Sequence, residues 1–87
     1  MYRILVADDE GIMLEAFKSV ISSTFGDSCI TETAKTGRAV TEKAETFHPD
    51  IVFMDIHMPG INGIQAMREI RKFNTTALFY VVSAYDK

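Results

Sequence analysis

Short apolar runs alternate along the chain with longer segments in which apolar residues recur every three or four positions. Four runs predict strands, at residues 3–7, 29–34, 51–54 and 77–83. Three segments predict helices, at residues 13–25, 37–47 and 63–73. Strands that alternate with helices in this way are typical of an α/β fold with a parallel sheet.

The spacing within each predicted helix indicates which side chains face the sheet. These are Met13, Phe17, Val20 or Ile21, and Phe25 in the first helix, Val40, Ala44 and Phe47 in the second, and Ile64, Met67 and Ile70 in the third. Gly26 and Asp27 end the first helix. Pro49 ends the second, because the residue before a proline is disfavoured in helical geometry.

The predicted strands differ in how polar they are. In residues 29–34, polar and apolar side chains alternate, which predicts a strand at the edge of the sheet. Residues 51–54 have no polar alternation and predict a central strand that is covered on both faces. Right-handed crossovers would place the three helices unevenly, with a single helix on one face. We therefore expect further residues in the natural chain, or a second copy, to supply the missing cover as a homodimer or a swapped oligomer.

Composition narrows the class of protein. The chain has 87 residues, of which 47% are hydrophobic and 24% are charged, which is typical of one small globular domain over residues 1–87. The net charge of -3 gives no basic surface for direct contact with nucleic acid or an anionic membrane. A single cysteine, Cys29, excludes an internal disulfide and a cysteine-based zinc site. No apolar run approaches the roughly 18 residues of a membrane span, and we expect a cytoplasmic location.

Three aspartates follow two of the predicted strands. Asp8 and Asp9 end the first strand, and Asp55 ends the third. If the strand order is 2-1-3-4, these two strands are neighbours at the point where the order reverses, which is where α/β sheets bind ligands. Carboxylates brought together there repel one another, and a hard divalent cation would relieve the repulsion. The sequence therefore predicts a Mg²⁺ site, beside which Asp55 can act as a nucleophile toward phosphorus.

The segments "ADDE", "IVFMDIHMPGINGI" and "VVSAYDK" resemble the receiver domain of two-component response regulators over nearly the whole chain. The resemblance implies a flavodoxin-like, doubly wound parallel sheet of order 2-1-3-4. It also implies a signalling module, rather than an enzyme, that takes a phosphoryl group from a sensor histidine kinase. The "SAYDK" ending and the long first helix are similar to receivers that precede AraC-type DNA-binding output domains. This implies a transcriptional output domain beyond the C-terminus.

The same resemblance assigns roles to individual residues. It makes Asp55 the phosphoacceptor. It also implies that the metal ligands are Asp8, Asp9, Asp55 and the backbone carbonyl of His57. Ser83 matches the switch hydroxyl that bonds the phosphoryl group, while Ala84 and Met58 line the phosphoryl pocket. The family's fifth strand, with its lysine and its aromatic switch residue, and its last two helices have no counterpart in the 87 residues. The resemblance thus predicts a receiver that is incomplete at its C-terminal end.

Two alternatives stay open beside this interpretation. A Mg²⁺-dependent phosphatase or phosphotransferase of the haloacid dehalogenase kind also uses an aspartate at the end of a strand. Such enzymes usually place a second aspartate two positions later as general acid, where this sequence has His57. The other alternative is an inactive fragment that only mediates an interaction.

Overall fold

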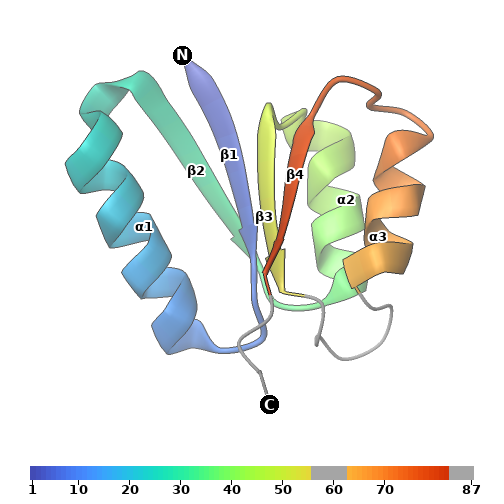
Figure 1. Ribbon diagram of the computed structural model, residues 1–87, viewed down its shortest axis with the longest axis horizontal. Coiled ribbons are helices and arrows are strands. Elements are labelled where there is room, and N and C mark those ends of the chain that lie inside the picture. The colour runs from blue at the N-terminus through green and yellow to red at the C-terminus, as the bar shows by residue number, and fades with distance from the viewer. Residues whose placement is uncertain (56–62, 83–87) are drawn as a thin grey trace.

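The computed structural model describes residues 1–55 and 63–82, which form a four-stranded parallel sheet of order β2-β1-β3-β4 (Figure 1). The elements are β1 (Tyr2–Ala7), α1 (Gly11–Phe25), a short 3-10 helix (Gly26–Ser28), β2 (Cys29–Ala34), α2 (Gly37–Phe47), β3 (Ile51–Asp55), α3 (Gly63–Arg71) and β4 (Leu78–Val82). Every predicted strand and helix is present, and the predicted strand order is confirmed.

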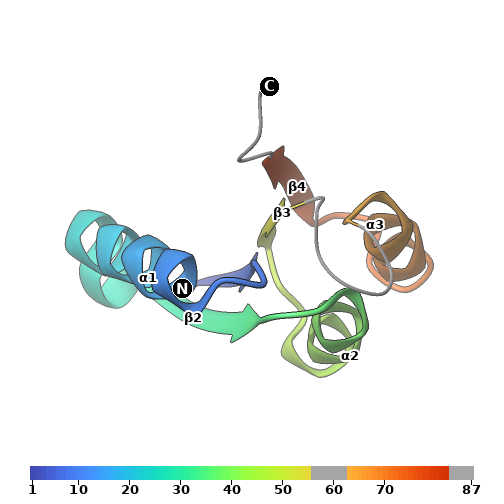
Figure 2. The same cartoon turned by 90° about the horizontal axis from the view of Figure 1, so that it is seen from below.

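The sheet is covered unevenly, as the alternation of strands and helices predicts. Figure 2 shows α1 alone on one face of the sheet and α2 and α3 together on the other. The core on the α2 and α3 side is formed by Leu5, Ala7, Ala34, Val40, Ala44, Val52, Met54, Ala66 and Ile70. The core on the α1 side has four buried residues, namely Ile4, Val6, Leu14 and Ile21. The larger core therefore lies under the pair of helices.

The predicted apolar stripe of α1 is right only in part: Ile21 is buried and Phe17 packs against the core as predicted, but the other predicted positions are not buried. Leu14 and Ile21 are the buried side chains of α1, whereas Met13, Val20 and Phe25 are exposed. The helix lies over β1 and β2, so the residues that face those two strands are buried. Met13 and Val20 lie on the flank of the helix instead.

The helix α3 also buries a different set of residues from the one predicted. Ile70 is buried as predicted and Met67 is half-buried, but Ile64 is exposed. Gly63 and Ala66 take its place in the core, because α3 packs against α2 and small side chains allow a close approach. Because Gly63 and Ala66 form the contact of α3 with α2, the larger side chain of Ile64 lies at the edge of that contact.

Hydrogen bonds fix the end of the sheet that lies away from the aspartates. The backbone N–H of Arg3 donates to a carboxylate oxygen of Asp50 at 2.8 Å, and the guanidinium of Arg3 donates to the carbonyl of Phe47 at 2.7 Å. His48 ends α2 in the left-handed conformation, with φ 53°. These contacts join the start of β1 to the turn between α2 and β3.

Candidate functional site

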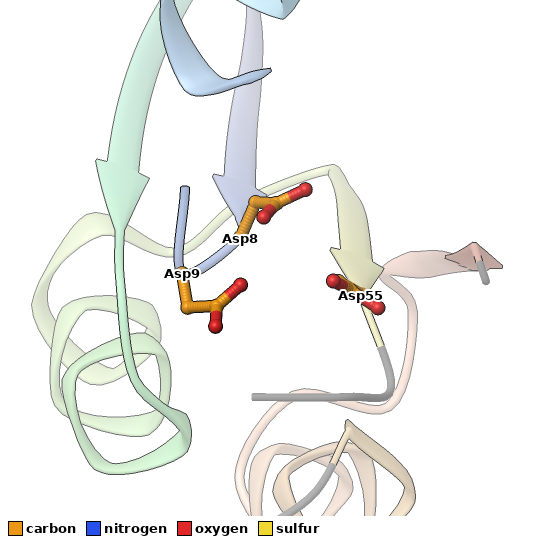
Figure 3. A group of neighbouring side chains, drawn as sticks. All are labelled: Asp8, Asp9 and Asp55. Atoms are coloured by element: carbon orange, nitrogen blue, oxygen red, sulfur yellow. The ribbon is translucent and has the colours of Figure 1, made fainter. Parts of the chain in front are cut away.

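Three carboxylates meet at the carboxyl ends of β1 and β3 (Figure 3). One ligand oxygen from each of Asp8, Asp9 and Asp55 lies within 4.8 Å of the other two. The register of the sheet brings these carboxylates together. Ala7 at the end of β1 pairs with Met54 of β3, and Asp8 and Asp55 are the next residues of the two strands. The predicted convergence of these residues is therefore confirmed.

Local hydrogen bonds hold Asp8 in place. Its backbone N–H donates to the carbonyl of Ala34 at 3.1 Å, which extends the pairing of β1 with β2 by one residue. Its carboxylate accepts the backbone N–H of Glu10 at 3.0 Å, which closes a turn of the kind that aspartate favours. Because α1 begins at Gly11, this turn also fixes where the helix starts.

The three side chains differ in exposure. Asp55 is 8% exposed, Asp8 is half-buried and Asp9 is exposed. Burial raises the pKa of Asp8, and the neighbouring charges of Asp55 and Asp9 raise it further. The hydrogen bond from Glu10 opposes this effect on the pKa but does not cancel it. The folded chain thus holds negative charges together at a cost in stability.

The donor set fits a hard cation. Three carboxylate oxygens within 4.8 Å, one nearly buried and one exposed to water, match the preference of Mg²⁺ for a few carboxylates together with water. Burial and the neighbouring charges of Asp55 and Asp9 raise the pKa of Asp8, and a bound cation would oppose this effect.

The remaining predicted site residues lie outside the described part of the chain. These are His57, Met58, Ser83 and Ala84. Their roles in metal binding, the phosphoryl pocket and switching stay predictions.

Two features beside the aspartates were not predicted from the sequence. A small apolar cavity of about 40 Å³ adjoins Asp8 and Asp55 and is lined by Met13, Phe17 and Phe53 among others. Lys35 follows the end of β2, and its ammonium lies 3.6 Å from where a Cβ on Gly11 would stand. The signal for Lys35 was available, because any residue that follows β2 shares a sheet edge with the residues that follow β1.

The comparisons with known proteins agree with this geometry. The sequence profile of the response regulator receiver domain matches residues 4–87. The chain belongs to this family. A curated relative, the chemotaxis protein CheY of Thermotoga maritima, is 39% identical over 82 residues, which are 94% of this chain and 67% of the relative. A second relative, a protein-glutamate methylesterase/protein-glutamine glutaminase of Alkalilimnicola ehrlichii, is 39% identical over 97% of this chain but only 22% of its own length.

Solved receiver structures have the same fold. A chain from the complex of histidine kinase ThkA with response regulator TrrA matches with a TM-score of 0.85 and 36% identity, over 100% of this chain and 72% of that one. A chain from the CheX–CheY–BeF3–Mg²⁺ complex of Borrelia burgdorferi matches with a TM-score of 0.86 and 28% identity, over 99% and 64%. The predicted flavodoxin-like arrangement is thereby confirmed.

Within the described residues, no helix has both the length and the apolar character needed to cross a membrane.

Proposed function

We propose that this receiver domain accepts a phosphoryl group on Asp55. The observation that carries the proposal is the cluster of three carboxylates at the point where the strand order reverses. Of the three, Asp55 is the most buried and stands at the end of a central strand, so its carboxylate is restricted in position. A fixed nucleophile reduces the entropic cost of in-line attack on phosphorus.

Mg²⁺ is the proposed cofactor, held by Asp8, Asp9 and Asp55 with the backbone carbonyl of His57. When bound, it would neutralise charge on the carboxylates and on the phosphoryl oxygens. A carboxylate oxygen of Asp55 forms the new bond to phosphorus, and the bond between phosphorus and the donor nitrogen breaks. The electron pair of that bond returns to the imidazole nitrogen of the donor. Ser83 then donates a hydrogen bond to the phosphoryl group, which Ala84 and Met58 border.

The proposed partner is a sensor histidine kinase, and the proposed readout is an output domain that binds DNA. The kinase partner is supported by the resemblance to a chain from a complex between a histidine kinase and a response regulator. The DNA-binding output rests on the similarity of the "SAYDK" ending to receivers of the AraC type. Added charge at Asp55 would shift an equilibrium between two receiver states, to which the output domain responds.

The test uses three forms of the chain: the parent, Asp55→Asn, and Asp27→Asn as a control. Asp27 is exposed in the 3-10 helix at the opposite end of the sheet, so its substitution changes the net charge equally without touching the site. Each form is incubated with Mg²⁺ and acetyl phosphate, and its intact mass is measured.

We expect one added phosphoryl group on the parent and on Asp27→Asn, none on Asp55→Asn, and none on any form when EDTA is present. A phosphoryl gain on Asp55→Asn, or no gain on the parent, would contradict the proposal. Repeated turnover of phosphate esters by the parent would favour a phosphatase of the haloacid dehalogenase kind instead.

A further inference from the structure

Lys35 places a positive charge at the same edge of the sheet as the three aspartates. Ala34 ends β2, and its carbonyl accepts the backbone N–H of Asp8 at 3.1 Å. Lys35 is the next residue, so it is the neighbour of Asp8 in the adjacent strand. The carboxyl ends of β2, β1 and β3 lie together at one edge of the sheet (Figure 1). The carboxylate cluster thus has a cation at its β2 side.

The side chain of Lys35 turns toward the start of α1. Successive side chains along a strand point to opposite faces of the sheet. Ala34 is buried in the core on the α2 and α3 side, so Lys35 points to the α1 side. Its ammonium lies 3.6 Å from where a Cβ on Gly11 would stand, and it lines a hollow there together with Glu15. Because Gly11 is two residues after Asp9, the ammonium adjoins the turn that carries the exposed carboxylate.

The helix α1 itself disfavours a cation at this position. The N-terminus of a helix carries partial positive charge, and the first turn of α1 holds no acidic residue. Within residues 1–55 and 63–82, the ammonium of Lys35 forms no ion pair with a carboxylate, Glu15 included. The negative potential that favours an ammonium here therefore comes from acidic groups that it does not contact, among which is the cluster of three aspartates.

Because no carboxylate contacts Lys35, its charge acts on the cluster across water. One and a half strand spacings, about 7 Å, separate β2 from the gap between β1 and β3. An ion held by the three aspartates would then lie roughly 7–10 Å from the ammonium. At this separation the repulsion between a unit charge and a divalent cation changes a Kd by about three- to fivefold at an ionic strength near 0.01 M. Near 1 M the effect almost vanishes, because the Debye length falls to about 3 Å.

We infer that Lys35 is an internal counter-charge of the cation site. It offsets the repulsion among the carboxylates when no ion is bound, and it lowers the affinity of the site for a divalent cation. The inference rests on the proposed function, because it takes the three aspartates as a cation site. It depends on the β2 side of the sheet, which lies across β1 from β3 and β4, so residues after β4 do not enter it.

The test compares four forms of the chain. Lys35→Met removes the charge and keeps a long apolar side chain, whereas Lys35→Arg keeps the charge. Lys18→Met is the matched control, because Lys18 is also exposed but lies further along α1, beside Ser22 and Gly26. Binding of Mn²⁺, which prefers the same oxygen ligands as Mg²⁺, is measured from the EPR signal of the free ion at ionic strengths of about 0.01 M and about 1 M. Circular dichroism verifies that each form is folded, and its Tm is measured in EDTA.

We expect Lys35→Met to bind Mn²⁺ about three- to fivefold more tightly than the parent at low ionic strength, and within about 1.5-fold of the parent at high ionic strength. Lys35→Arg should match the parent, and Lys18→Met should differ from it by less than about twofold. In EDTA, Lys35→Met should have a lower Tm than the parent. A merely structural role for Lys35 would weaken both folding and cation binding, so tighter binding by a less stable variant identifies the effect of charge.

Equal Kd values for the parent and Lys35→Met at low ionic strength would overturn the inference and leave the cation site intact. Weaker binding by Lys35→Met would overturn it as well. A parent that binds no Mn²⁺ would overturn the cation site of the proposed function together with the inference, so the two failures are distinguishable.

Discussion

Replacing Asp8 with asparagine removes one of the three negative charges at the carboxyl ends of β1 and β3. Asparagine has the same shape, and its side-chain oxygen can still accept the backbone N–H of Glu10 that Asp8 accepts at 3.0 Å. The change therefore isolates the charge of Asp8 from its hydrogen bond. We expect Asp8→Asn to stabilise the chain when no divalent cation is present.

The size of the effect follows from the separation of the carboxylates. Two unit charges 4.8 Å apart repel by about 3.5 kcal/mol at an effective dielectric constant near 20 and by about 1 kcal/mol in bulk water. Asp8 is half-buried and Asp9 is exposed, so solvent screening holds the result toward the lower part of this range. A gain of about 1–2 kcal/mol corresponds to a rise in Tm of about 5–10 °C for a domain of this size.

The assay is thermal unfolding with and without Mg²⁺. Mg²⁺ stabilises any form that binds it only when folded, by about 2.7 kcal/mol at 100 times the Kd. The order of thermal stability should thus reverse between the two buffers, with Asp8→Asn more stable in EDTA and the parent more stable in Mg²⁺. Asp27→Asn, which alters the same net charge far from the site, should follow the parent in both buffers. Equal stabilisation of the parent and Asp8→Asn by Mg²⁺, with no difference in EDTA, would refute the reasoning.

Three further predictions concern the pH dependence of stability and of Mg²⁺ affinity, a substitution at the end of α2, and the packing of α3. Because the pKa of Asp8 is raised in the folded chain, the metal-free protein should lose stability as the pH rises from the ordinary aspartate pKa through the raised value. Mg²⁺ affinity, followed by calorimetry, should fall as the pH drops through the same window, and a pH-independent affinity would contradict this. His48→Gly should stabilise the chain by about 0.5–1 kcal/mol in urea unfolding, because glycine adopts the left-handed conformation without strain; a loss of stability would show that the histidine side chain matters more. Ile70→Ala should cost about 2–4 kcal/mol and Ile64→Ala no more than about 1 kcal/mol, since only Ile70 is buried; equal costs in urea unfolding would be inconsistent with this packing.

The four strands could be predicted because each depends on features that are local in the sequence, whereas the strand order that brings Asp8 and Asp55 together is implied by the resemblance to receiver domains. An apolar run that ends in aspartate identifies a strand and its carboxyl end, and the carboxyl ends of neighbouring parallel strands share one edge. The sequence therefore predicts that Asp8 and Asp55 lie together if the first and third strands are neighbours. The exposed fractions of Asp8 and Asp55 depend on which segments of the folded chain pack around them, and no local sequence pattern predicts that packing.

The rotation of α2 was predicted correctly, since Val40 and Ala44 are buried and Phe47 packs against the core, but the rotation of α1 and α3 could be predicted only in part. In α1, apolar residues occur on most of the circumference, including Met13, Leu14, Val20 and Ile21, so the period alone does not select the buried stripe. The position of α1 over β1 and β2 selects it, and that position belongs to the tertiary structure. In α3, contact with α2 favours small side chains over Ile64.

The most direct test of a shared cation site is NMR of the labelled chain during a titration with Mn²⁺, a paramagnetic ion that prefers the same oxygen ligands as Mg²⁺. The backbone amide signals of Asp8, Asp9 and Asp55 should broaden together at the lowest Mn²⁺ concentrations, and excess Mg²⁺ should restore them. If broadening begins elsewhere, for example around the exposed Glu42 and Glu45 of α2, or reaches Asp8 without Asp55, the three aspartates do not form one cation site.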